Sequence, residues 1–115
     1  MPLDIQESRI EDITVLGLVG RLAMGQEGQR VETIVEDVCR PPGAKVIFDM
    51  SGVTYIDSMG IGILTMAAGK LKASGGRLVV VTPADKRTAN LLTLTQINLL
   101  VSVCETAEQA RGMFA

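Results

Sequence analysis

Two short runs of consecutive apolar residues constrain the fold of this chain most strongly. Residues 46–50 hold no polar side chain before Asp49, and residues 78–81 are apolar throughout. A strand with one solvated face alternates apolar and polar residues, whereas a strand covered on both faces has a continuous apolar run. We therefore expect both runs to be buried strands, with residues 46–50 central in a sheet.

Apolar side chains at spacings of three and four residues predict helices between these strands. The first helix spans residues 29–39, and Pro41-Pro42-Gly43 ends it. The second helix runs from about Ser58 to Ser74 and stops at Gly75-Gly76, because glycine readily adopts the left-handed conformation of a helix C-terminus.

Two further helices are predicted from their capping residues. Asp85 is a candidate N-cap for a helix that continues through Leu94. Thr106 and Gln109 have the spacing of a capping box, in which each side chain bonds the backbone near the other, so a short final helix begins there and ends near Phe114.

The remaining strands are predicted at residues 3–9, 13–19 and 99–104, with residues 51–56 as a loop. The first two strands are separated by a turn of three residues and form a hairpin. The order is then ββαβαβαβα, and helical crossovers make the later strands mostly parallel. We predict an α/β fold, a single domain over residues 1–115 with a mixed, mostly parallel sheet, an N-terminal β-hairpin and four helices.

Composition excludes several classes of function. The chain has 11 Lys plus Arg against 13 Asp plus Glu, no His, no Trp and three aromatic residues, so it lacks the cationic stripe and stacking faces of a nucleic-acid binder. Without His, no Ser-His or Cys-His catalytic pair and no His-ligated metal site can form. We expect no catalytic residues, no metal, no cofactor and no direct nucleic-acid partner.

Cysteine usage and hydropathy indicate the compartment. Cys39 and Cys104 lie in apolar surroundings far apart in the sequence, and the N-terminus has neither a basic region nor an apolar signal segment. The longest mostly apolar stretch, residues 61–68, is well short of the ~20 residues of a membrane-spanning helix. We expect a cytoplasmic protein without a membrane span.

The motif that runs from Asp57 to Gly62 lies between a predicted strand and a predicted helix. In one interpretation Asp57 or Ser58 only caps the helix by accepting hydrogen bonds from its first amides. In the other, Ser58 is exposed at the helix N-terminus, and Gly60 and Gly62 allow a partner protein to approach closely enough to phosphorylate it.

The segment from Val53 to Gly62 resembles the signature of the bacterial anti-sigma factor antagonists, members of the STAS domain family. The resemblance extends over nearly the full chain. The other matching segments are Gly20-Arg21-Leu22, Gly75-Gly76, the predicted strand 78–81 and residues 91–95.

The resemblance implies a switch protein. Its unphosphorylated form would bind an anti-sigma factor, commonly also a serine kinase, and so release a sigma factor. Ser58 matches the phosphoacceptor, which a phosphoserine phosphatase would restore, and Asp57 and Gly60 match its neighbours. We expect the partner surface to comprise Asp57, Ser58, Met59, Gly60, Gly62 and, in a nearby loop, Met24.

Three alternatives stay open at this point. An interaction module of the same fold without a switch, such as a scaffold subunit or a soluble partner of a membrane transport complex, has the same pattern. A receiver domain would use Asp49 as its acceptor, but its acidic pair and terminal lysine are missing. A small-molecule-binding domain or enzyme finds no nucleophile–base pair in the sequence. The sequence determines neither the oligomeric state nor the identity of the sigma factor.

Overall fold

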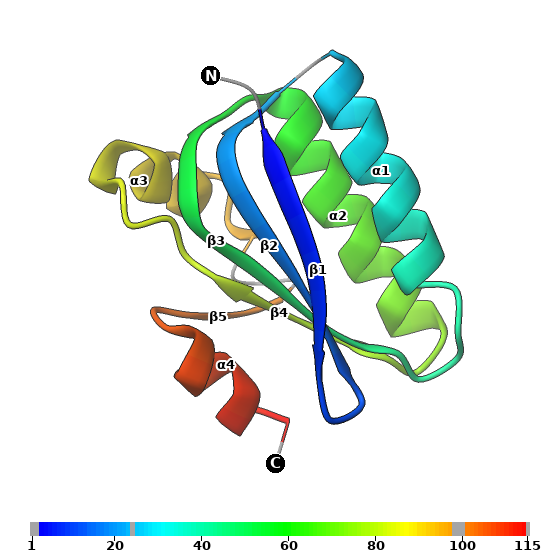
Figure 1. The fold of residues 1–115 in the computed structure, drawn as a ribbon. Coiled ribbons are helices and arrows are strands. Elements are labelled where there is room, and N and C mark those ends of the chain that lie inside the picture. Colours follow the sequence, from blue (N-terminus) through cyan, green and yellow to red (C-terminus); the bar gives the residue numbers. More distant parts are fainter. Residues whose placement is uncertain (1–2, 24, 98–100, 115) are drawn as a thin grey trace.

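The computed structural model, which describes residues 3–23, 25–97 and 101–114, contains five strands and four helices over those residues (Figure 1). The elements follow the predicted order ββαβαβαβα. Their bounds are β1 Asp4–Ile10, β2 Ile13–Leu22, α1 Gln26–Val38, β3 Lys45–Ile56, α2 Ser58–Ala73, β4 Arg77–Val81, α3 Lys86–Leu94, β5 Ser102–Cys104 and α4 Ala107–Gly112.

The strands form one mixed sheet in the order β1-β2-β3-β4-β5. β1 and β2 pair antiparallel from Asp4 opposite Val19 to Ile10 opposite Ile13, which confirms the N-terminal hairpin. All later neighbours pair in parallel, because each connection passes through a helix. β3 is the middle strand, as its continuous apolar run predicts.

β3 is much longer than the sequence indicates, and the prediction of a loop over residues 51–56 is wrong. These residues continue the strand beside β2 as far as Ile56, opposite Leu22. The polar and small residues mark irregular pairing instead of a loop, since the register shifts between Gly17 and Val19. At that point the Asp49 carboxylate accepts hydrogen bonds from the Ser51 hydroxyl (2.7 Å) and amide (3.1 Å).

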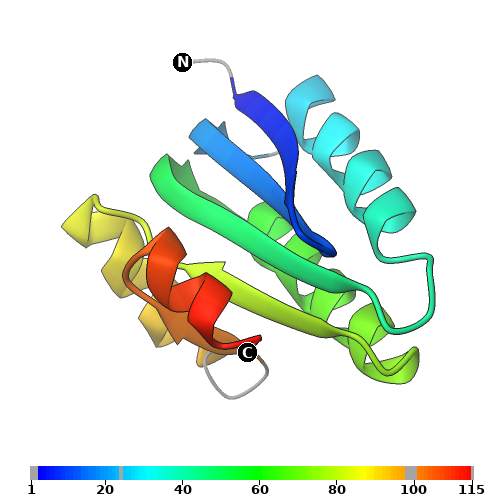
Figure 2. The same ribbon diagram turned by 60° about the horizontal axis from the view of Figure 1, so that its bottom comes forward.

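The helices form layers on the two faces of the sheet (Figures 1 and 2). α1 and α2 run side by side along one face, where Val35 and Leu64 pack with Phe48 in the larger core cluster. α4 covers the opposite face, where Ala110 packs with Ile47 in the smaller cluster. Because β3 is covered on both faces, its alternate side chains enter two different cores.

α3 lies apart from the two-helix layer, beside the end of β3 (Figure 1). It begins at the predicted N-cap, where the Asp85 carboxylate accepts a 2.9 Å hydrogen bond from the Thr88 amide. Its inner side contributes Leu92 to the larger core cluster. α3 therefore stands next to the point at which the chain leaves the sheet and enters α2.

Several element ends differ from the predictions. β2 continues to Leu22 and α1 begins at Gln26, so the connection between them is shorter than expected. β5 is described from Ser102, and residues 99 and 100 of the predicted strand lie outside the described residues. At α4, Thr106 accepts from the Gln109 amide (3.1 Å), and the Gln109 side chain accepts from the Glu105 amide (2.9 Å), one residue before the cap.

Candidate functional site

Ser58 is the first residue of α2, and a single residue, Asp57, separates it from the end of β3. Its side chain is exposed. β3 is held by β2 up to Ile56, so the position of Ser58 is set by the sheet and not by a mobile connection. A rigid, exposed serine at a helix N-terminus is accessible to another protein's active site.

Asp57 is the N-cap of α2. Its Oδ1 accepts hydrogen bonds from the amides of Met59 (3.0 Å) and Gly60 (3.1 Å), and its own amide donates to the carbonyl of Leu22 at 3.3 Å. A carboxylate at this position stabilises a helix by about 1 kcal/mol. Of the two residues proposed as the cap, Asp57 has that role, and the Ser58 hydroxyl is not needed for it.

Gly60 is buried, and a side chain there would collide with its neighbours. A Cβ built on it would lie 2.6 Å from Ile56 Cγ1 and 2.7 Å from the carbonyl oxygen of Leu22. The glycine lets α2 approach the end of β2, so Gly60 has a packing role in the fold, and the partner contact expected at this residue stays a prediction. Gly62 lies in the next turn of α2, is exposed, and would place its Cβ in open space.

Met59 is half-buried and packs against α1. A Cβ built on Gly28 of α1 would lie 3.1 Å from Met59 Sδ. Part of this side chain thus fixes α2 to α1, while the rest remains available at the surface. Met24, the other methionine predicted at the interface, lies outside the described residues.

Ser58 also lies on the rim of an apolar hollow of about 510 Å³ between the start of α2 and α3. Tyr55 and Leu91 are large apolar residues of this rim, with 39% and 44% of their surface exposed. Exposed apolar side chains that gather around a hollow are typical of a binding surface. The lining residues are Tyr55, Ile56, Asp57, Ser58, Ile61, Leu91 and Thr95.

The position of α3 beside Ser58 was not predicted from the sequence. One signal for it was present, because residues 91–94 include leucines at positions 91, 92 and 94, which cannot all face one side of a helix. Leu92 is buried, whereas Leu91 and Leu94 are exposed. A leucine opposite the buried face of a short helix therefore marked a second apolar surface.

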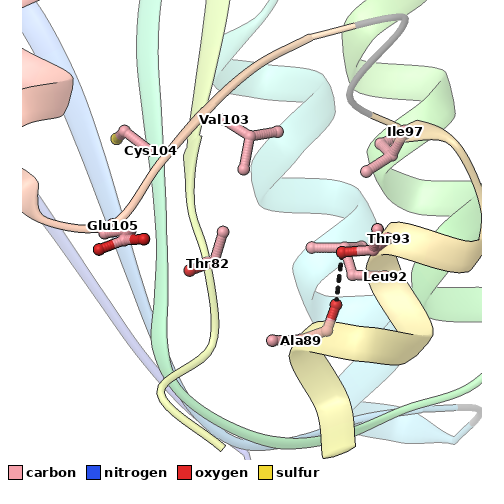
Figure 3. A pocket seen from close by; sticks show the side chains of 8 residues that line it. All are labelled: Thr82, Ala89, Leu92, Thr93, Ile97, Val103, Cys104 and Glu105. Carbon is pink, nitrogen blue, oxygen red and sulfur yellow. Dashed lines mark hydrogen bonds between the residues drawn. The ribbon is translucent and has the colours of Figure 1, made fainter. Parts of the chain in front are cut away.

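A second hollow of about 340 Å³ lies between α3 and the end of the sheet (Figure 3). Its lining includes Cys104, whose Sγ lies 3.4 Å from the carbonyl oxygen of Thr106 and 3.7 Å from that of Val80. Burial raises the pKa of this thiol, so it stays protonated at neutral pH and is a poor nucleophile. The hollow is lined by Thr82, Ala89, Leu92, Thr93, Ile97, Val103, Cys104 and Glu105.

Residues 3–23, 25–97 and 101–114 show neither a metal site nor a membrane-spanning helix. Within these residues, no three or more Asp, Glu, Cys or His side chains are arranged to hold a metal ion. No helix in the same part of the chain has the length and apolar character needed to cross a membrane.

Comparison with known proteins identifies the family to which this chain belongs. The family model that describes the STAS domain matches residues 4–110 of this chain. The chain belongs to the STAS domain family. The receiver-domain alternative is therefore excluded, and in this STAS domain Asp49 lies inside β3, bonded to Ser51, and not at a strand end.

Solved structures share this fold at low sequence identity. A candidate anti-sigma factor antagonist from Thermotoga maritima is 21% identical, with a TM-score of 0.84 over 95% of this chain and 92% of that one. The phosphorylated form of SpoIIAA from Bacillus is 17% identical, with a TM-score of 0.73 over 97% and 100%. The murine anion transporter Slc26a9 is 16% identical with a TM-score of 0.66, and the match covers 91% of this chain but 18% of the transporter.

Proposed function

We propose that this STAS domain protein is an anti-sigma factor antagonist whose binding is switched off by phosphorylation of Ser58. The unphosphorylated chain binds an anti-sigma factor that is also a serine kinase, and a sigma factor is released. A phosphoserine phosphatase returns the chain to its binding form. The protein acts by binding and not by catalysis, in the cytoplasm, and without a cofactor.

The observation that carries this proposal is the position of Ser58, exposed at the start of α2 and on the rim of the apolar hollow. A partner that covers the hollow also covers this serine. The similarity to SpoIIAA, whose structure is described in both an unphosphorylated and a phosphorylated form, supports the proposal of a phosphorylation switch.

The switch follows from the charge of a phosphate group. Phosphorylation adds nearly two negative charges, and in the free chain they remain solvated, so the fold is retained. The amides of Met59 and Gly60 already donate to Asp57 and cannot both neutralise the phosphate without breaking the cap. In a complex the dianion would be desolvated beside a carboxylate. A cost of about 4 kcal/mol weakens binding about a thousandfold.

The test uses anti-sigma factor kinases of the source organism, purified one by one. With ATP, we expect the cognate kinase to add one phosphate, located on Ser58 by mass spectrometry. Ser58→Ala should bind this kinase as the wild-type chain does and accept no phosphate. Ser58→Asp should bind more weakly, whereas Ser8→Asp, which adds the same charge on exposed β1, should not. Equal affinity of Ser58→Ala and Ser58→Asp would contradict the switch.

The second candidate is an interaction module without a switch. The match to a domain-sized part of the transporter Slc26a9 supports it, since the same fold occurs there within a much longer chain. Such a module would bind its partner equally well with Ala or Asp at position 58 and would remain unphosphorylated in the presence of every kinase tested.

A further inference from the structure

Exposed apolar residues extend the surface around Ser58 onto α3. Among the described residues, five large apolar side chains are exposed. Three of these belong to the two elements that border the hollow: Tyr55 is in β3, and Leu91 and Leu94 are in α3. Leu94 is 78% exposed and follows Leu91 by three residues, so both lie on the outer face of the same helix. The apolar surface therefore continues from the hollow along α3.

This outer face of α3 is not required for the fold. Its inner face already provides Thr88 and Leu92 to the interior, with 2% exposure each. Leu91 and Leu94 could be replaced by polar side chains without loss of core packing. Apolar side chains in solvent on a face that the core does not use indicate a surface that another molecule covers.

The cationic side chain of Arg21 contacts one of the residues that line the hollow. The guanidinium carbon of Arg21 lies 4.1 Å from the centre of the Tyr55 ring, which lines the hollow. Within the described part of the chain, the three ion pairs do not include Arg21. A guanidinium held on an aromatic face keeps its hydrogen-bond donors directed outward and available to a carboxylate.

The hollow itself takes an uncharged group. Its one acidic residue is Asp57, whose Oδ1 is directed to the amides of Met59 and Gly60. The other lining side chains are apolar or neutral. The occupant is thus apolar where it enters the hollow and acidic where it meets Arg21.

We infer that the partner docks on a composite surface of Tyr55, Ile61, Leu91, Leu94 and Arg21, and that its docking segment carries an apolar side chain next to a carboxylate. This inference rests on the proposed function, since the partner is the anti-sigma factor kinase. It explains why a phosphate on Ser58 would weaken partner binding. The added dianion lies on the rim of the hollow and repels the carboxylate that approaches Arg21.

The test compares paired variants for affinity to the cognate kinase. Leu91→Ala should weaken binding about 30-fold, as expected for an apolar anchor at the centre of an interface. Ile10→Ala, which truncates another exposed apolar residue at the far end of the hairpin, should leave the affinity unchanged. Arg21→Gln should weaken binding about fivefold and reduce its dependence on salt, and Arg21→Lys should restore most of the affinity. Arg9→Gln is the matched charge control on exposed β1.

These variants should all fold, because the altered side chains are at least partly exposed, and circular dichroism at rising temperature verifies it. If Ser58→Asp weakens binding while Leu91→Ala and Arg21→Gln behave like their controls, the composite surface is wrong and the proposed function stands. If Leu91→Ala weakens binding and Ser58→Asp does not, the surface is right and the switch is wrong. Self-association of the free chain that Leu91→Ala abolishes would assign the surface to a second copy and overturn the inference. If no kinase binds the wild-type chain, both fail.

Discussion

Two glycines in the first turns of α2 should respond in opposite ways to the same substitution. Gly60→Ala places a methyl group 2.6 Å from Ile56 Cγ1 and 2.7 Å from the carbonyl oxygen of Leu22. The isoleucine side chain can move aside, but the carbonyl belongs to the end of β2, so backbone has to shift. Gly62→Ala meets nothing within 4 Å.

The magnitudes follow from two effects of different sign. Alanine is better than glycine in a helix interior by about 1 kcal/mol, and this gain applies at both positions. At Gly60 it is opposed by overpacking of about 3 kcal/mol, since a backbone atom is involved. Gly60→Ala should therefore lower the free energy of unfolding by about 2 kcal/mol, and Gly62→Ala should raise it by up to about 1 kcal/mol.

Urea unfolding followed by circular dichroism is the appropriate measurement, because the chain has no Trp and one Tyr for fluorescence. For a chain of this size, thermal unfolding should shift by about −8 °C for Gly60→Ala and by a few degrees upward for Gly62→Ala. An unchanged urea midpoint for Gly60→Ala would refute the close contact between α2 and β2. A lower midpoint for Gly62→Ala would refute the open surface at that position.

Three further predictions concern the cap and the buried thiols. Asp57→Ala should lower the free energy of unfolding by about 1 kcal/mol in urea, and Asp57→Asn, which keeps the capping oxygen, by much less. Burial raises the pKa of Cys39 from 9.0 to about 11, so unfolding releases a proton in this range, and the free energy of unfolding falls as the pH rises through it. Cys39→Ala should remove that part of the slope. At neutral pH, a thiol reagent should label Cys39 and Cys104 in urea but neither in the folded chain, and rapid labelling without urea would contradict their burial.

Much of the fold could be predicted because its signals are local in the sequence. The apolar runs in β3 and β4 indicate buried strands, and the capping residues Asp85 and Thr106 mark helix starts whatever the rest of the chain does. The wrong prediction of a loop over residues 51–56 also comes from relying on local sequence signals. Ser51 and Gly52 are residues typical of a turn, and pairing with β2, more than 30 residues earlier, holds this part of the chain in a strand.

For the candidate site, the sequence by itself determined which serine starts α2 and which acidic residue stands beside it, since strand, cap and helix follow one another along the chain. Only the tertiary structure decided what surrounds Ser58. Gly60 is buried because the end of β2 lies against α2, and Leu91 reaches the hollow because α3 returns beside the end of β3. Arg21 and Tyr55 meet for the same reason, as the sheet pairs them across two strands. Such contacts depend on how distant elements pack, and no short stretch of sequence contains that information.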